Sequence, residues 1–389
     1  MRKILLATTA LIGFAAAGAA QAAPAPLTVT VGGGVDFLAG AFHSSRAAGA
    51  TNPSSGDFET LYSLDFGIAG KSASGVEYGG ALALDNYPDI NNLFAGNGNN
   101  VAVRTADIFM SGAFGKVQLG DARGATDLIV ATPSVGEGQV SGRYIDFLDS
   151  ETYSKSFIVG VDGTDHGTNV TYYTPKVGND KNKVQLGVTF TPNFYDYGST
   201  VVLAEKTAPT VGNSPYKNVV KGALAYAGAA GDVKLDASAH IISGVSDVIG
   251  ANGKVRDFTA WGVGAKAALR GFTFGGTYVD MGHYATNIGQ RKDQQQYGAG
   301  VTYDFCCKLA MGVSYLGGSA YDNMLSLPIA ATGLNRNYVK DFNSYGVGGA
   351  YIWAPGLTTN VDGVLFSQKA DVTSKNDGYV LLVSQKLAF

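Results

Sequence analysis

Histidine, cysteine and serine side chains with catalytic or metal-binding spacing are scarce in this chain. The four histidines are His43, His166, His240 and His283. None lies in an H-E-x-x-H sequence, and no G-x-S-x-G sequence marks a nucleophilic serine. A hydrolytic site assembled from distant loops stays open only as a minor alternative, so we expect the chain not to be an enzyme.

Metal-binding patterns are also missing. The two cysteines, Cys306 and Cys307, are adjacent and lack the C-x-x-C spacing of a zinc site, so they form either a vicinal disulfide or two free thiols. Asn86, Asp89 and Asn91, with neighbouring Asn92, do not have the spacing of a calcium loop. We therefore expect no cofactor and no metal.

The N-terminus has the three parts of a secretory signal peptide. Arg2 and Lys3 precede an apolar stretch over residues 4–20, and Ala20-Gln21-Ala22 has the small-x-small pattern of a cleavage site. We expect cleavage after Ala22. Residues 23–389 then carry 26 basic and 31 acidic side chains, a net charge of −5, which is opposite to the basic footprint of a nucleic-acid-binding protein.

Composition points to a barrel rather than to soluble domains. The chain has 54 glycines, 21 tyrosines and 19 phenylalanines, and only 15% of its residues are charged, against about 25% in soluble domains. No apolar run after residue 22 is long enough for a transmembrane helix. Exported chains of this kind suit an all-β, transmembrane, antiparallel up-and-down β-barrel, whose apolar residues alternate with polar ones.

Sixteen segments show this rhythm. Residues 233–241 are an example, because Leu235, Ala237 and Ala239 alternate with Lys234, Asp236, Ser238 and His240. The predicted strands begin near Leu27, Phe58, Val76, Val101, Lys116, Asn169, Lys183, Val219, Asp232, Phe258, Phe272, Gln295, Lys308, Phe342, Leu357 and Asp377. Short turns and long connections alternate between them, as an even-stranded barrel with both termini on the periplasmic side requires.

Alternation also assigns side chains to the two faces of the predicted wall. The charged and polar residues that it places on the lumen wall are Asp36, Glu77, Asp85, Lys234, Asp236, His240 and Lys266. Aromatic residues near strand ends suit girdles at the two membrane interfaces. The examples are Tyr172, Tyr173, Tyr226, Tyr278, Trp353 and Tyr379, although packing against another subunit explains any single one equally well.

Two internal stretches, VRTADIFMSGAFGKVQLG over residues 103–120 and TNVTYYTPKVG over residues 168–178, carry longer motifs. The first is similar to a strand hairpin of the Gram-negative general porins, of the alphaproteobacterial type, and the second resembles the strand that follows the constriction loop of that family. The terminal Phe389 follows Tyr379, Leu381, Val383 and Leu387 on one strand face, which resembles the barrel-assembly signal, although Gln385 interrupts it.

The resemblance implies a sixteen-stranded homotrimer whose third external loop, residues 123–167 here, folds inward and narrows the pore. In this family acidic residues of the loop face arginines of the wall. The resulting candidates for the constriction are Glu137, Asp127, Asp146, Arg123 and Arg143 on the loop, with Arg104 and Asp65 on the wall. Glu137 is the first choice because Gly136 and Gly138 flank it.

Two wall positions bear on selectivity. Asp65 points inward where relatives often carry arginine. Strict alternation places Arg104 and Asp107 on opposite faces, so with Arg104 inside we expect Asp107 to face outward. We therefore expect passive diffusion of small hydrophilic solutes and ions, with weak cation preference.

The expected partners are outer-membrane lipid, lipopolysaccharide and, through Phe389, the barrel assembly machinery. A substrate-specific channel is the main alternative, since Phe194, Tyr195 and Tyr197 could form an aromatic slide. A structural or adhesive barrel is less favoured.

Overall fold

Long antiparallel strands account for most of the computed structural model. It describes residues 27–45, 55–86, 101–137, 142–147, 167–193, 216–246, 249–250, 253–284, 286, 288, 294–305, 308–319, 339–370 and 375–389. The expected signal peptide, the two cysteines, the aromatic residues at 194–197 and residues 148–166 of the long loop lie outside this part of the chain.

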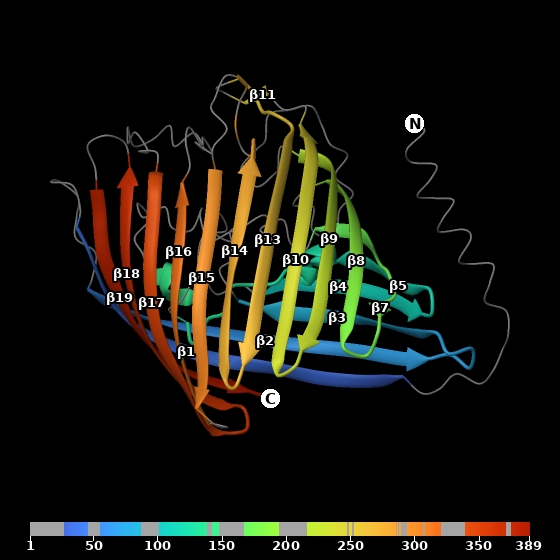
Figure 1. Ribbon diagram of the computed structural model, residues 1–389, viewed down its shortest axis with the longest axis horizontal. Coiled ribbons are helices and arrows are strands. Elements are labelled where there is room, and N and C mark those ends of the chain that lie inside the picture. Colours follow the sequence, from blue (N-terminus) through green and yellow to red (C-terminus); the bar gives the residue numbers. More distant parts are fainter. Residues whose placement is uncertain are drawn as a thin grey trace.

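The wall of the molecule is a closed, sixteen-stranded antiparallel β-barrel (Figure 1). Its strands are β1 (Thr28–Ser44), β2 (Gly56–Lys71), β3 (Glu77–Asp85), β4 (Ala102–Gly112), β5 (Gly115–Asp121), β6 (Thr168–Tyr173) with β7 (Val177–Gly178), β8 (Asn182–Asn193), β9 (Tyr216–Ala230), β10 (Val233–Ser246), β13 (Phe258–Leu269), β14 (Phe272–Gly282), β15 (Gln294–Phe305), β16 (Leu309–Ser319), β17 (Val339–Ala354), β18 (Leu357–Ala370) and β19 (Lys375–Ala388). Both β6 and β7 pair with β8, so together they occupy the place of one strand in the barrel.

Consecutive strands of the barrel pair with one another, and β1 pairs with β19 to close the barrel. The closure extends to the last residue, because Gly33 and Phe389 exchange two backbone hydrogen bonds of 3.1 and 3.0 Å. Closure leaves the described barrel wall without an open edge, which a bilayer demands because unpaired backbone groups are costly in hydrocarbon. The expected fold class is confirmed, and each predicted strand start lies within three residues of the observed one.

Tight turns join neighbouring strands at one end of the barrel. The β13–β14 turn shows how the sequence dictates them, because Arg270 and Gly271 both have positive φ angles, 51° and 85°. Two such residues make the hairpin turn whose twist matches that of the strands it joins. A short hairpin, β11 (Ile249–Gly250) and β12 (Gly253–Lys254), lies between β10 and β13 at the opposite end.

Side chains alternate between an exposed outer face and a covered inner face. On β10, Leu235 and Ile241 are exposed on the outside, whereas Ser238, His240 and Ile242 are buried on the inside. Tyr173 departs from its expected place in an outer girdle. Tyr172 is exposed, so its neighbour Tyr173 points inward, where its hydroxyl donates a hydrogen bond to the Gly124 carbonyl.

The buried apolar residues form two clusters on the inner wall. One lies over β9, β10, β13 and β14 and includes Tyr216, Ile242 and Phe258. The other lies over β16–β19, β1 and β2 and surrounds η3 (Arg143–Phe147), a short helical turn of the long loop. No helix in the described residues is long and apolar enough to cross a membrane.

Candidate functional site

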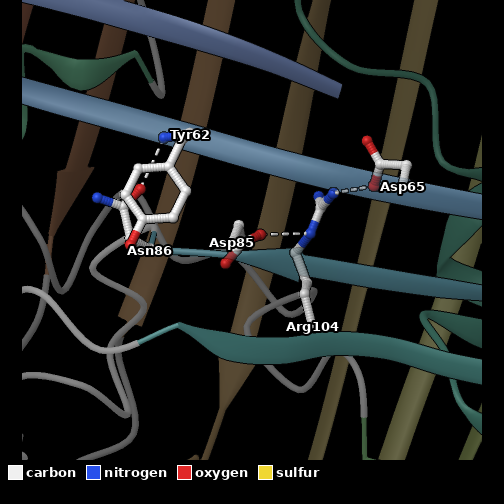
Figure 2. Close-up of polar contacts among 5 residues, drawn as sticks. All are labelled: Tyr62, Asp65, Asp85, Asn86 and Arg104. Atoms are coloured by element: carbon white, nitrogen blue, oxygen red, sulfur yellow. Dashed lines mark hydrogen bonds and ion pairs between the residues drawn. The ribbon is translucent and has the colours of Figure 1, made fainter. Parts of the chain in front are cut away.

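The inner wall of β2, β3 and β4 holds a three-residue charge cluster centred on Arg104 (Figure 2). The Nε atom of Arg104 lies 2.6 Å from an Asp85 carboxylate oxygen, and its guanidinium lies 3.5 Å from Asp65. The Asp85 side chain is 5% exposed, whereas those of Arg104 and Asp65 are 40% and 46% exposed. Two carboxylates therefore share one cation on the lumen side, which leaves a net negative charge.

A β-bulge in β4 turns Arg104 toward this cluster. The β3–β4 register runs from Ala83 opposite Thr105 directly to Leu84 opposite Val103, so Arg104 is an extra residue on β4. An extra residue shifts the alternation by one position beyond the bulge. Arg104 and Asp107 consequently share the inner face, and Asp107 is only 8% exposed. The expectation that Asp107 faces outward is wrong, because it assumed an unbroken strand.

Asn86 directly follows β3 beside this cluster. Its side-chain oxygen accepts a hydrogen bond from the Tyr62 N–H at 2.7 Å, and its side-chain nitrogen donates one to the Thr60 carbonyl at 2.9 Å. The side-chain amide thus extends the pairing past the last residue of β3 and holds this end of β3 against β2.

The other wall residues lie on the inner face but in separate groups. On β10 and β13, Asp236 lies opposite Lys266 in register, and their charged atoms are 3.5 Å apart. Lys234 and His240 share that face, and His240 is buried. Glu77 pairs with Lys71 at 3.2 Å near the short-turn end, where both side chains are more than half exposed. Glu77 is therefore placed near a mouth of the barrel rather than at its middle.

The long loop crosses the inner wall and is hydrogen-bonded to one strand after another. Backbone N–H groups of the loop donate to hydroxyls of the wall, from Ala125 to Thr189 on β8 (2.7 Å) and from Val130 to Ser238 on β10 (2.8 Å). Further along, the Thr132 and Thr277 hydroxyls of the loop and β14 lie 2.9 Å apart. Residues 124–132 thus follow the wall from β8 to β14.

Small residues make room for this path. A side chain on Gly264 would meet the Val130 carbonyl oxygen at 2.3 Å, and one on Gly300 would meet the Pro133 carbonyl oxygen at 2.0 Å. Both contacts are with backbone atoms, so the loop backbone would have to shift to accommodate either side chain. The loop therefore lies directly against glycines of β13 and β15.

The loop reaches the opposite wall at Glu137. Its N–H donates a 2.8 Å hydrogen bond to a carboxylate oxygen of Asp362 on β18, and Gly136 lies against the same carboxylate. Asp36 of β1 is 5% exposed and interacts electrostatically with Glu137, Arg143 and Lys386. The structure thus brings Asp36, Glu137 and Arg143 together, and adds two wall residues that were not expected, Asp362 and Lys386.

The turn η3 fixes the next part of the loop through apolar contacts. Tyr144 is completely buried and Phe147 is 5% exposed, both within a cluster of wall residues: Leu38, Leu61, Leu316, Phe342, Val364, Phe366, Val380 and Leu382. The Phe147 ring occupies the space beside Gly40. Burial raises the pKa of the Tyr144 hydroxyl above its ordinary value. Arg143 and Asp146 form an ion pair of 3.3 Å on the same turn.

Arg123 directly precedes η2 (Gly124–Leu128), and Asp127 lies within this turn, which packs near β6, β8 and β9. The Arg123 carbonyl accepts a contact of 3.5 Å from Nζ of Lys221, a wall lysine only 1% exposed. The Tyr173 hydroxyl lies 3.5 Å from the exposed carboxylate of Asp127. No group of three His, Cys, Asp or Glu residues in the described part of the chain could hold a metal ion.

Comparisons with known proteins agree with this architecture. A family model described as Gram-negative porin matches residues 7–371. No curated protein matches the chain significantly. Among solved structures, the anion-selective porin from Comamonas acidovorans superposes with a TM-score of 0.57 at 14% identity, covering 94% of this chain and all of that one.

Two further solved structures share the fold. The outer membrane channel DcaP of Acinetobacter baumannii gives a TM-score of 0.56 at 15% identity, over 93% of this chain and 97% of that one. OmpT, an outer membrane protein of Vibrio cholerae, gives 0.54 at 14% identity, over 95% of this chain and all of that one. At these identities the likeness concerns the fold alone.

Proposed function

Because the chain belongs to the Gram-negative porin family, we propose that this outer-membrane channel passes small hydrophilic solutes and ions by passive diffusion, with a weak preference for cations. The family and the fold point to a channel rather than an enzyme. We place both chain ends and the short turns on the periplasmic side of the outer membrane, so that the long connections face outward.

The Arg104 cluster is the observation that carries the cation preference. Charge lining a narrow passage controls which ions enter, because the field is strongest there. Arg104 is the wall arginine of the proposed constriction, and two carboxylates already neutralise it. Asp107 adds a further acidic side chain to the same face. The wall near Arg104 therefore favours cations.

The inward loop supplies the second side of the proposed constriction. Its acidic residues Asp127, Glu137 and Asp146 are accompanied by Arg123 and Arg143. Since Arg143 is paired with Asp146, the loop carries charges of both signs and no strong anion-attracting field. The preference for cations is for this reason weak.

Reversal potentials in planar bilayers test the proposal. With a potassium chloride gradient across the bilayer, the purified protein is expected to show a potential whose sign reports modest cation selectivity. A clear anion selectivity would contradict it. Single-channel conductance that rises in proportion to salt concentration supports simple diffusion, whereas saturable block by one solute would support a substrate-specific channel.

Assembly and export complete the proposal. Residues 1–22 are the cleaved signal peptide, three copies associate in the outer membrane beside lipopolysaccharide, and Phe389 is read by the barrel assembly machinery. The polar Gln385 within this C-terminal strand is compatible with an apolar face, because its side chain bonds to Thr359, which in turn accepts a hydrogen bond from Trp353. Cross-linking of membranes and mass spectrometry of the mature chain test these points.

A further inference from the structure

A groove of about 660 Å³ lies on the outer face of β15–β19. Its floor is one cross-strand row, in which each residue lies opposite the next: Val301, Val313, Val347, Gly363 and Leu381. Gly363 makes the deepest point, because a Cβ atom there would still be 3.5 Å from Leu381 and 3.7 Å from Val347. The floor is therefore wholly aliphatic and open to the membrane.

The next row toward the long-loop end forms the wall of the groove. It contains Tyr315, Tyr345, Leu365 and Tyr379, again opposite one another in register. The rings of Tyr315 and Tyr345 are in contact, with centroids 5.0 Å apart. Their hydroxyl ends are polar, and that of Tyr315 donates a 2.6 Å hydrogen bond to Asn343 in the following row.

Two lysines lie beyond these tyrosines on the same outward face. Lys369 of β18 and Lys375 of β19 are direct neighbours in register. Lys369 is four residues beyond Leu365, about 13 Å along the strand at roughly 3.3 Å per residue. Asp377 lies 2.6 Å from Lys375, and Asp341 of β17 is opposite Lys369 in register, so the rim carries charges of both signs. From membrane core to outer rim, the order is aliphatic, aromatic, polar and charged.

We propose that this groove holds one acyl chain of an anionic phospholipid, with the phosphate of its headgroup beside Lys369 and Lys375. The order of the rows matches the order of groups along a phospholipid, from hydrocarbon to phosphate. Aromatic residues also mark the other membrane boundary on this side, where Tyr351 and Trp353 contact each other at 4.7 Å. An aliphatic band between two aromatic levels is typical of a lipid-facing wall.

The acyl chain is retained by its contacts in the groove and by the polar contacts of its headgroup. Hydrocarbon gains no hydrophobic transfer energy by leaving other lipid tails, so dispersion contacts in a matching groove and polar contacts at the rim supply the preference. The site is therefore sensitive to a side chain that fills the groove. The groove lies on the outer wall, so its occupancy by lipid does not depend on which ions the lumen passes.

Gly363→Phe and Gly349→Phe form a matched pair of test variants. Gly349 also lies on the outer face, opposite Met311 and Val361, but outside the groove, and a Cβ atom there has no neighbour closer than 3.6 Å. The delipidated full chain, purified in mild detergent, is titrated with dimyristoylphosphatidylglycerol, and bound lipid is counted by native mass spectrometry.

Wild type and Gly349→Phe are expected to retain one lipid per chain, and Gly363→Phe to retain about tenfold less at equal lipid concentration, a change of ~1.4 kcal/mol. Changing Lys369 and Lys375 together to glutamine is expected to weaken retention as well. Equal retention by both phenylalanine variants would overturn the proposal. So would dissociation of the oligomer by Gly363→Phe, because it would show that a second copy covers the groove. If Gly363→Phe fails to fold on heat-modifiable gels, Gly363→Leu replaces it with the same expectations.

Discussion

The guanidinium Nε of Arg104 lies 2.6 Å from the carboxylate of Asp85, although a β-bulge had to turn Arg104 inward to reach it. Asp65 approaches the same guanidinium from β2 (Figure 2). An isolated wall arginine would attract anions, whereas this one is outnumbered by its own neighbours. The balance of charge at this point of the lumen consequently depends on a single side chain.

Arg104→Gln is expected to increase cation selectivity. It removes the only cation of the cluster and leaves both carboxylates facing the lumen. A unit charge about 4 Å from an ion's path contributes ~1 kcal/mol in water and more in a confined channel. The cation-to-anion permeability ratio should therefore rise about fivefold, since ~1.4 kcal/mol corresponds to tenfold.

Lys71→Gln is the control for this measurement. It removes the same charge from an ion pair, but at an exposed position near the short-turn end. Reversal potentials of the two variants and of wild type are compared under one salt gradient. If Arg104→Gln left the ratio unchanged, or raised anion permeability, Arg104 would not line the path of the ions.

Much of this arrangement could be predicted from residue order alone. Alternation of period two placed Asp36, Asp65 and Lys266 on the inner face, because each lies in a strand without a bulge near it. It failed at Asp107, since nothing local distinguishes Arg104 as the extra residue of β4. Bulges depend on the partner strand, and pattern reasoning on one strand does not include the partner.

The seating of the long loop could not be predicted for a related reason. Glu137 and Asp362 are 225 residues apart in the chain and meet only because the barrel closes. Alternation on β18 would have put Asp362 inside, beside Asn360 and Val364, but not under the loop. Likewise, the composition showed many glycines, whereas only the structure shows that Gly264 and Gly300 lie against the loop backbone.

Asp362→Ala is expected to loosen the middle of the loop without unfolding the barrel. It removes the acceptor of the Glu137 N–H, and a hydrogen bond to a charged group contributes about 1.5–3 kcal/mol. Hydrogen exchange at Glu137 should therefore accelerate by at least about tenfold. Asn360→Ala is the control, because its partner is Ser384 on the neighbouring strand rather than the loop. Equal protection in both variants would mean that other contacts hold the loop.

Gly300→Val is expected to push the loop away from β15 and narrow the lumen. The new side chain would occupy the position of the Pro133 carbonyl oxygen, and overpacking of this kind costs about 1–3 kcal/mol. Single-channel conductance should fall, while Gly349→Val, with open space on the outer face, should conduct as wild type does. An unchanged conductance of Gly300→Val would show that residues around Pro133 do not border the path of the ions.

Tyr144 is expected to make the packing of η3 against the inner wall sensitive to alkaline pH. Burial raises the pKa of its hydroxyl, so the apolar cluster around the side chain favours the neutral form. A group whose folded pKa lies above its unfolded value contributes stability that is complete below the unfolded pKa, about 10 for tyrosine, and lost as the pH rises above it. Between about pH 9 and pH 11, exchange of the amides of residues 143–147 should therefore accelerate beyond its intrinsic pH dependence. Tyr144→Phe keeps the ring in its apolar site and removes the hydroxyl, which lies 3.4 Å from that of Ser344, so it should abolish this extra acceleration. If the variant showed the same pH response as wild type, ionisation of another group would be releasing the turn.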